Sequence, residues 1–420
     1  MNNGEWLIKK KVLLSSSTFH ASRFKITTMS FTPALRIANL GGYAFAEVDK
    51  KAAELRDAGI TPIDFGVGDP VNPTPAFIRE ATRKALDQRA TSGYPSYIGS
   101  EEFRRAVAKW MQNRFGVELN PATEITSSIG SKEAIFHFPL AFINPGDEVL
   151  IPSPGYPPYA RGTQFAGGKS IYYPLLEENN FLPDFNYLKK VVTEKTKILW
   201  INYPNSPTGK LASDEVFKQA INFGKKYNII IASDAAYSEI YFEKKPRSIL
   251  EFIKTGVVEF HSLSKRSAMT GYRVGWVAGD AKIIDLFKKV KTNIDSGTPT
   301  FLQDAAITAL TDEKHIKAMR MEYKEKRNIL VSALEKFGLS KCLPEATFYI
   351  WQKVPKGISS VEFATKLLDP KIAVVVTPGE WISETIEGVN PGANFVRFAL
   401  VPTVEQVKEA AEKIIKNLKI

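Results

Sequence analysis

The chain of 420 residues has a single cysteine, Cys342, and only four histidines. One cysteine cannot form a disulfide within the chain, so we expect a reducing compartment such as the cytoplasm. The histidines (His20, His137, His261 and His315) are scattered, and none belongs to the closely spaced pairs typical of metal sites. The composition therefore argues against a disulfide scaffold and against a metal centre.

The sequence also lacks long apolar runs and long blocks of like charge. No run reaches the length of a membrane span, so we expect no membrane partner. The formal net charge is +11, but the basic residues are spread along the chain, which argues against a nucleic-acid-binding tail. A basic protein suits a phosphate-bearing cofactor and acidic substrates. With 44% hydrophobic and 24% charged residues, the chain reads as globular and long enough for two domains.

The first 28 residues differ from the rest of the chain. They hold five basic residues against a single acid, Glu5, a composition that resembles an organelle transit peptide. We favour the alternative of an upstream start codon before a true start at Met29, because the apolar run 12–14 is too short for a signal-peptide core. In either case we expect this leader, residues 1–28, to be poorly ordered.

In the middle of the chain, apolar runs typical of strands alternate with helical patterns. This alternation predicts an α/β fold with a mostly parallel sheet and crossover helices. We expect strands at 124–127, 149–151, 170–173, 198–202, 229–233, 257–260 and 274–278. Ligands of such sheets collect beyond the carboxyl ends of the strands. Gly130, Tyr156, Asn205, Asp234 and Lys265 all follow predicted strands, so we expect them at one edge.

A long helix expected at 312–337 follows this series, and the pattern then changes to a small α+β unit. We place a domain boundary near residue 315, with a large domain over 76–314 and a small domain over 315–420. The N-terminal segment 29–75 is expected to pack with the small domain.

The most suggestive motif is Ser262-Leu263-Ser264-Lys265, with Arg273 eight positions after the lysine. It follows an apolar run that reads as a buried strand. A lysine partly desolvated beside another cation favours its neutral amine and can form a Schiff base. Ser262 and Arg273 offer partners for a phosphate. Pyridoxal phosphate needs both features, whereas the alternative reading of these residues alone is a solvated Lys-Arg corner.

Two further charged residues lie in apolar surroundings. Asp234 ends an apolar strand, where a carboxylate is costly unless it is paired. A pyridinium N–H would be a fitting partner, and a helix N-cap is the alternative. Arg397 lies inside the apolar run 395–399, and a buried arginine demands an anion. That anion is either a substrate carboxylate or the acid of a structural salt bridge.

Together these motifs resemble the class I and II aminotransferases of pyridoxal-phosphate fold type I, over nearly the whole chain from about Ser30. The resemblance rests on the order and spacing of Ser262–Lys265 with Arg273, Asp234-x-x-Tyr237, Pro207-Thr208-Gly209 and Arg397. It implies a large domain with a mostly parallel mixed sheet and helices on both faces, plus a smaller α+β domain. It also implies a homodimer with shared active sites.

The resemblance implies a role for each matching residue. Lys265 would form the Schiff base with the cofactor and then move the proton of the substrate. Asp234 would pair with the pyridine nitrogen, Tyr237 would hydrogen-bond the ring oxygen, and Tyr156 would stack on the ring. The phosphate would be held by Ser131, Lys132, Ser262 and Arg273, and across the dimer by Tyr94. The substrate would be held by Gly68, Arg397 and Tyr43.

One position departs from the family pattern. The family usually has Asn directly before Pro-Thr-Gly, bonding the ring oxygen, where this chain has Ser206. Either Asn205, one position earlier, takes over through a shifted loop, or Ser206 makes a weaker bond.

Several runs, at 39–48, 64–70, 130–133 and 147–159 with 165–168, are most similar to the LL-diaminopimelate aminotransferases of bacteria and archaea. That resemblance implies transfer of an amino group between LL-diaminopimelate and 2-oxoglutarate on the lysine route. Aspartate or aromatic aminotransferases share parts of these runs, and a β-lyase on the same fold would keep the same cofactor residues. A transcription regulator would need a DNA-binding module, which a 28-residue leader is too short to hold.

Overall fold

The computed structural model describes residues 31–38, 46–70 and 72–419, and the chain divides into two units, 1–41 and 42–420. The first unit contains the short helix α1 (Leu35–Ala38). All other elements belong to the second unit. In the described ranges, no helix combines the length and the apolar character needed to cross a membrane.

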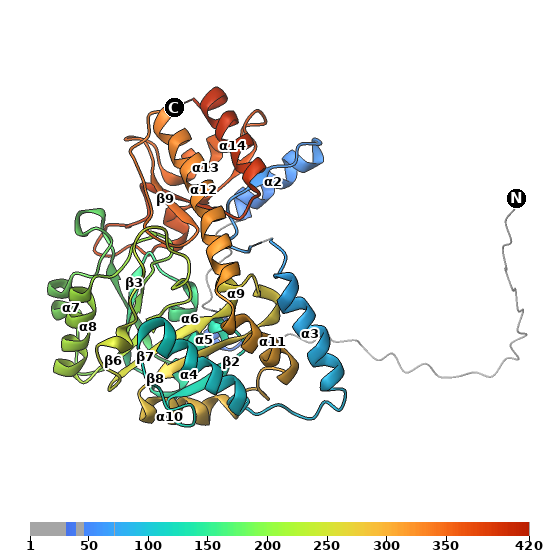
Figure 1. The fold of residues 1–420 in the computed structure, drawn as a ribbon. Coiled ribbons are helices and arrows are strands. Elements are labelled where there is room, and N and C mark those ends of the chain that lie inside the picture. The colour runs from blue at the N-terminus through green and yellow to red at the C-terminus, as the bar shows by residue number, and fades with distance from the viewer. Residues whose placement is uncertain (1–30, 39–45, 71, 420) are drawn as a thin grey trace, which may run out of the picture. The chain divides into compact units, whose positions relative to one another are not determined.

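A seven-stranded sheet forms the centre of the second unit (Figure 1), in the order β2-β8-β7-β6-β5-β3-β4. Its strands are β2 (Ile125–Ser128), β3 (Glu148–Ser153), β4 (Lys169–Pro174), β5 (Thr196–Asn202), β6 (Ile230–Asp234), β7 (Val257–Ser262) and β8 (Gly275–Gly279). β8 runs antiparallel to both neighbours, and the other pairs are parallel. The predicted mixed, mostly parallel sheet is confirmed.

Helices cover both faces of this sheet, and each face has its own hydrophobic core. Along β5, Leu199 and Ile201 enter one core, while Ile198 and Trp200 enter the other. Such alternation is typical of a strand buried on both sides. The first core is covered by α3 (Ala76–Gln88), α4 (Glu101–Phe115), α7 (Phe185–Val191), α8 (Asp214–Tyr227) and α11 (Thr300–Thr311). The second is covered by α5 (Ser131–His137), α6 (Pro157–Phe165) and α10 (Ala281–Lys291).

The C-terminal elements are grouped at the top of Figure 1 around a smaller antiparallel sheet, β11-β12-β9. They are α12 (Lys314–Lys336), β9 (Tyr349–Lys353), α13 (Ser360–Leu367), β10 (Val374–Val375), β11 (Thr377–Pro378), β12 (Phe395–Ala399) and α14 (Val404–Asn417). The N-terminal part of the second unit joins this group: β1 (Ile63–Asp64) pairs in parallel with β10, and α2 (Ala46–Asp57) packs Ala52 and Leu55 against Leu368. The division into domains stays a prediction.

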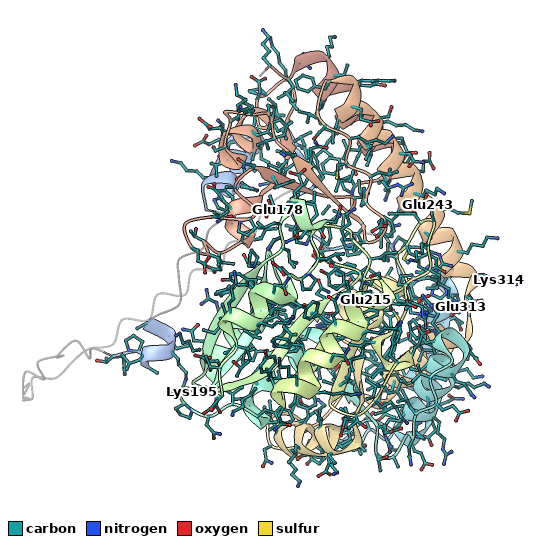
Figure 2. The ribbon with its side chains drawn as sticks, turned by 90° about the vertical axis from the view of Figure 1, so that its left-hand side faces the viewer. Glu178, Lys195, Glu215, Glu243, Glu313 and Lys314 are labelled. Carbon is teal, nitrogen blue, oxygen red and sulfur yellow. The ribbon has the colours of Figure 1, made fainter. Side chains whose placement is uncertain are left out.

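Helix α12 connects the two sheets. At its beginning, the buried Arg266 guanidinium lies 2.5 Å from Glu313, and the Ser267 hydroxyl lies 2.9 Å from His315 Nε2. Figure 2 shows Glu313 at this end of the helix, and beside the helix farther along it shows Glu243, which follows β6 and pairs with Arg327 of α12. Further on, the ring of Tyr323 packs on Phe348, next to β9. The helix therefore links the segment after β7 to the smaller sheet.

Candidate active site

A cavity of about 460 Å³ lies at the carboxyl ends of the strands of the large sheet. It is lined by residues that follow β2, β3, β5, β6 and β7, together with residues from β9 and β12. Ten of the residues singled out from the sequence line it: Gly68, Ser131, Lys132, Tyr156, Asp234, Tyr237, Ser262, Lys265, Arg273 and Arg397. Residues spread over more than three hundred positions thus converge on one site.

Lys265 lies on α9 (Leu263–Arg266), one helical turn directly after β7. The Ser262 hydroxyl caps this turn by accepting the N–H of Ser264 at 3.1 Å. Lys265 Nζ donates to the Gly68 carbonyl at 2.6 Å. Burial, assisted by the positive charges of Arg273 and Arg397, lowers the pKa of Lys265 to about 8, against the opposing charge of Asp69. A neutral, nucleophilic amine is therefore accessible near neutral pH.

Asp234 ends β6 and is only 5% exposed. Its Oδ2 accepts the Tyr159 hydroxyl at 2.6 Å, and its Oδ1 accepts the Ala236 N–H at 3.1 Å. Burial raises the pKa of Asp234 above its usual range, and these two hydrogen bonds oppose the rise. A carboxylate held this rigidly in a dry site favours a cationic N–H partner.

Arg273 and its neighbours form a cationic corner of the cavity. The residue adopts a left-handed backbone, with φ of 55°, and its Nη1 donates to the Thr270 carbonyl at 2.7 Å. Its Nη2 donates to the Ile129 carbonyl at 3.3 Å. The next residue, Gly130, has φ of +72°, and a Cβ there would overlap the Arg273 guanidinium. Only glycine therefore lets the turn before α5 approach this arginine.

A cluster of buried charges, Glu133, Lys291 and Asp295, supports the same turn. Glu133 Oε2 accepts the Ile129 N–H at 3.0 Å and lies 3.4 Å from Lys291 Nζ. Lys291 is fully buried and also pairs with Asp295 at 2.8 Å. Burial alone would raise the pKa of Glu133, but His137, Lys291 and the Ile129 N–H together lower it. The cluster therefore keeps Glu133 charged and bonded to the turn.

Arg397 lies on β12 at the opposite side of the cavity. Its Nη2 donates to the Gly66 carbonyl at 2.8 Å and lies 3.2 Å from the Thr377 hydroxyl. Within the described residues, its buried Nε has no hydrogen-bond partner. A half-buried guanidinium whose buried Nε has no partner is suited to bind an anion, such as a carboxylate, in the cavity.

Three contributors to the site go beyond the sequence prediction: Tyr159, Asn202 and Tyr349. Tyr159 holds Asp234, and Asn202 donates to the Asp234 carbonyl at 2.9 Å. Tyr349 lines the cavity, and its hydroxyl lies 3.0 Å from that of Tyr237. Tyr159 lies within α6, Asn202 ends β5 and Tyr349 begins β9; all three look like core residues in the sequence, so only their contacts reveal them.

Asn205 lies in the turn after β5, outside the cavity lining, and its assignment to the cofactor ring stays a prediction. Its side chain is 1% exposed and does not line the cavity. Its Oδ1 accepts both the N–H and the hydroxyl of Thr208, at 3.1 and 2.7 Å, so the amide stabilises the turn rather than facing a ligand. Ser206 lines the cavity instead. Of the two alternatives for the missing family asparagine, the structure therefore favours Ser206.

Two other predicted residues lie outside the cavity or outside the described chain. Tyr94 is 90% exposed and does not line the cavity, and its predicted role requires a second subunit. Its assignment stays a prediction. Tyr43 lies outside the described residues, and its assignment also stays a prediction.

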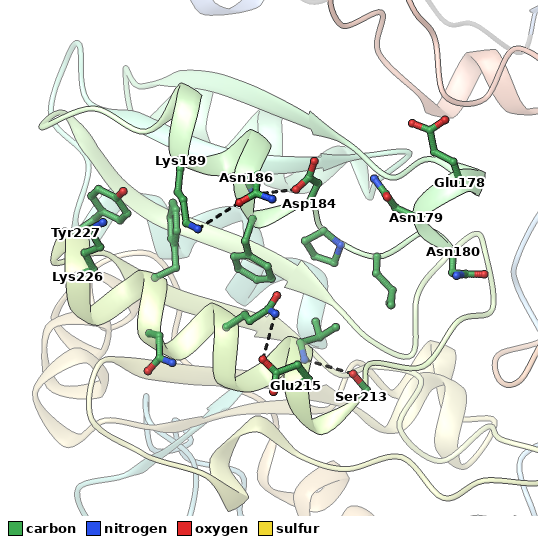
Figure 3. Close-up of a pocket in the computed structure, with 17 residues that line it drawn as sticks. Glu178, Asn179, Asn180, Asp184, Asn186, Lys189, Ser213, Glu215, Lys226 and Tyr227 are labelled. Carbon is green, nitrogen blue, oxygen red and sulfur yellow. Dashed lines mark hydrogen bonds between the residues drawn. The ribbon is translucent and has the colours of Figure 1, made fainter.

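A larger cavity, of about 680 Å³, lies between α7 and α8 (Figure 3). The hydrogen bonds drawn there are local contacts: Ser213 caps Val216, Asp184 caps Asn186, Gln219 donates to Glu215 one turn away, and Lys189 donates to Asn186. Its charged groups face solvent, and none is drawn into a converging set. We therefore assign the chemistry to the smaller cavity around Lys265. In the described part of the chain, no group of three or more His, Cys, Asp or Glu side chains could hold a metal ion.

Comparisons with known proteins identify the family of the chain. The family model for aminotransferase class I and II matches residues 60–414. The LL-diaminopimelate aminotransferase of Aquifex aeolicus is 48% identical, covering 92% of this chain and 98% of that protein. That of Maridesulfovibrio salexigens is 45% identical, covering 92% and 99%.

Solved structures show the same fold. Substrate-bound BacF from Bacillus subtilis aligns with a TM-score of 0.84 at 33% identity, covering 92% of this chain and 98% of that chain. A single mutant of the aspartate aminotransferase of Thermus thermophilus aligns with a TM-score of 0.85 at 27% identity, covering 93% and 100%. With its mixed sheet, its converging cavity and these relatives, the chain belongs to the class I and II aminotransferase family, and it is an enzyme with the fold-type I architecture.

Proposed function

We propose that the protein uses pyridoxal phosphate to move an amino group between LL-diaminopimelate and 2-oxoglutarate, as a step of lysine biosynthesis. The observation that carries the proposal is the convergence of Lys265, Asp234, Arg273 and Arg397 on one cavity. The substrate is supported by relatives named LL-diaminopimelate aminotransferase, which are 42–48% identical over at least 90% of this chain.

The residues present fit pyridoxal phosphate. The buried Asp234 carboxylate suits a protonated pyridine nitrogen, and Arg273 with Ser262 suits a phosphate. Gly130 keeps the space beside Arg273 free of a side chain. The phenol of Tyr156, whose pKa is raised first by burial and then by Asp234, stays neutral and offers a ring face. When bound, the cofactor would supply an electron sink for the carbanion formed at the substrate Cα.

The protein's own groups would bind and orient the substrate and move its proton. Arg397 would hold the α-carboxylate in two hydrogen bonds, one of them from the Nε that lacks a partner within the described residues. Gly68 and Tyr349 flank this position, and the Gly68 carbonyl contacts Lys265 Nζ. With a pKa of about 8, Lys265 can take up the Cα proton and return it as a general acid.

The segment 293–300 supports a substrate other than a simple dicarboxylate. A dicarboxylate-only enzyme would need an arginine for the second carboxylate, supplied by this segment of the partner subunit, and the sequence Asn293-Ile294-Asp295-Ser296-Gly297-Thr298-Pro299-Thr300 has none. In the structure, Asp295 pairs with Lys291, and the buried Thr298 donates to the Ser128 carbonyl at 3.1 Å. The distal end of diaminopimelate carries an ammonium beside its carboxylate, so small polar groups suit it better than a lone cation.

We propose that the protein is a cytoplasmic homodimer with shared active sites. Val67 lines the cavity yet is 61% exposed, and Tyr94 is 90% exposed. Large apolar and aromatic side chains exposed at and near a site are expected where a second subunit covers them. Sedimentation of the holoenzyme, and rescue of a Tyr94→Phe variant by mixing with a Lys265→Ala variant, would test the shared site.

Comparison of kcat/KM for LL-diaminopimelate, meso-diaminopimelate and aspartate, each with 2-oxoglutarate, tests the substrate. We expect LL-diaminopimelate to be used far better than aspartate, and the meso isomer to be poorer because its distal stereocentre is inverted. A clear preference for aspartate would overturn the substrate and leave transamination intact. A β-lyase would fail a different test, because only a transaminase releases 2-oxoglutarate stoichiometrically from glutamate in a single half-reaction.

A further inference from the structure

Tyr349 occupies a junction between the anion-binding and the lysine-bearing sides of the cavity. It is the first residue of β9 and is 4% exposed. In the β9–β12 pair, Arg397 lies opposite Trp351 and Ala399 lies opposite Tyr349. Tyr349 and Arg397 therefore share one face of the small sheet. The Arg397 guanidinium lies 4.7 Å from the centre of the Tyr349 ring.

The hydroxyl of Tyr349 meets Gly68 and Tyr237. A Cβ at Gly68 would overlap this hydroxyl, so the glycine is needed for the chain to pass over the tyrosine. The hydroxyl lies 3.0 Å from that of Tyr237, and the two rings meet edge to face at 5.7 Å. The Tyr349 hydroxyl thus lies beside two groups. One is Gly68, whose carbonyl accepts a hydrogen bond from Lys265, and the other is Tyr237, which we expect to bond the ring oxygen of the cofactor.

The direction of the Tyr349–Tyr237 hydrogen bond follows from what Tyr237 must do. A phenol has a single proton to donate. If Tyr237 donates that proton to the ring oxygen of the cofactor, its own oxygen is left to accept the proton of Tyr349. Donation by Tyr349 then makes Tyr237 a stronger donor, because hydrogen bonds in series polarise one another. The bond matters more here because Ser206 stands where the family usually has an asparagine.

We propose that Tyr349 is a positioning residue that acts through Tyr237 to fix the hydrogen bond at the cofactor's ring oxygen, and that it ties this bond to the α-carboxylate site at Arg397. The inference rests on the proposed cofactor and deepens it. None of the roles that the resemblance implies falls on Tyr349. Tyr349 and Tyr237 are then energetically coupled, and a double-variant cycle measures that coupling directly.

The test is the pH midpoint of the visible absorption band of the cofactor-loaded enzyme, measured for wild type, Tyr349→Phe, Tyr237→Phe and the double variant. If Tyr237 donates more weakly, the ring oxygen keeps more negative charge. The proton on the nearby Lys265 nitrogen is then held to higher pH. We expect Tyr349→Phe to raise the midpoint by at least about 0.5 pH unit. In the Tyr237→Phe background, the same substitution should change the midpoint by less than about 0.3 unit, since there is no donor left to strengthen.

Tyr323→Phe is a matched control. Tyr323 is 3% exposed and packs on Phe348, the neighbour of Tyr349, but it does not line the cavity. We expect its midpoint to equal that of the wild type. An equal shift for Tyr349→Phe in both backgrounds, or no shift in the wild-type background, would overturn the inference while leaving the proposed function standing. A wild-type protein that shows no cofactor band at all would overturn both.

Discussion

Replacing Lys291 tests whether the buried cluster of Lys291, Glu133 and Asp295 supports cofactor binding as well as stability. Replacement of Lys291 by methionine keeps the length and the apolar stem of the side chain but removes the ammonium. Its contacts with Asp295 at 2.8 and 3.0 Å, and with Glu133 at 3.4 Å, are then lost. Two carboxylates remain close together without the cation between them.

The size of the effect can be worked from the structure. Removing one partner of a buried ion pair costs about 3–5 kcal/mol. The carboxylate side chains keep 12% and 15% exposure, for Glu133 and Asp295 respectively, so water reaches them and the lower value of about 3 kcal/mol applies. For 420 residues, an unfolding entropy of about 2.1 cal/mol/K per residue converts this loss to a fall in Tm of about 3 °C.

The same substitution should weaken the binding of pyridoxal phosphate. Without Lys291, repulsion between the carboxylates turns Glu133 away from the Ile129 N–H, and the Ile129 carbonyl no longer holds Arg273 in place. We expect an approximately tenfold rise in the Kd of the apoprotein for pyridoxal phosphate, equivalent to about 1.4 kcal/mol. Titration of the apoprotein, followed by the cofactor's absorbance, measures it.

Lys326→Met is the matched control. Lys326 is also fully buried, and it lies 2.6 Å from Glu322 at the same four-residue spacing, on α12. It should lower Tm by a similar amount without changing the Kd for the cofactor. Equal Kd values for the two variants would refute the claim that the cluster supports the phosphate side of the cavity. An unchanged Tm for Lys291→Met would refute the estimate of its energy.

Three further predictions concern Asp234 and Lys265 at the centre of the site. Asp234→Asn should leave the protein folded and able to bind cofactor but lose most of its rate, because the carboxylate no longer keeps the ring nitrogen protonated; a near-wild-type kcat would mean that the ring is misplaced. The apoprotein should capture pyridoxal phosphate faster as pH rises through about 8, the pKa of Lys265, because the neutral amine is the reactive form. Above that pH the rate should level off; a rate that keeps increasing up to pH 10.5, the ordinary pKa of lysine, would contradict the lowered pKa. Lys265→Ala should abolish both the capture and the activity, because it removes the amine that lies in the cavity beside the Gly68 carbonyl and that we expect to form the Schiff base.

Strong periodic patterns made most of the fold predictable from the sequence. The seven expected strands of the large sheet are all present, with ends displaced by at most two residues. The sequence does not predict helix α6, because Pro157-Pro158 is typical of a turn. Proline is nevertheless tolerated in the first helical turn, where the N–H groups have no partner. Helices α10 and α11 likewise lie beyond the predicted elements.

The residues of the site also differ in how well the sequence predicts them. Charged residues in apolar strands, such as Asp234 and Arg397, reveal themselves because their burial demands a partner. Tyr349 does not, because a tyrosine at the start of an apolar strand is indistinguishable from a core residue. Asn205 and Ser206 differ by one position in a tight turn, and which of them faces the cavity depends on the turn's internal hydrogen bonds to Thr208. Sequence patterns carry periodicity well and such contacts poorly.

The span of the cavity along the chain has a consequence for biosynthesis. Its lining begins at Val67 and ends at Arg397, on the strand that pairs with β9. A nascent chain can form the large sheet while this strand is still inside the ribosome, but it cannot yet close the anion-binding side of the cavity. Cofactor retention during translation should therefore arise only after β12 has emerged, so that the cofactor would mark completed chains rather than guide the folding of early ones.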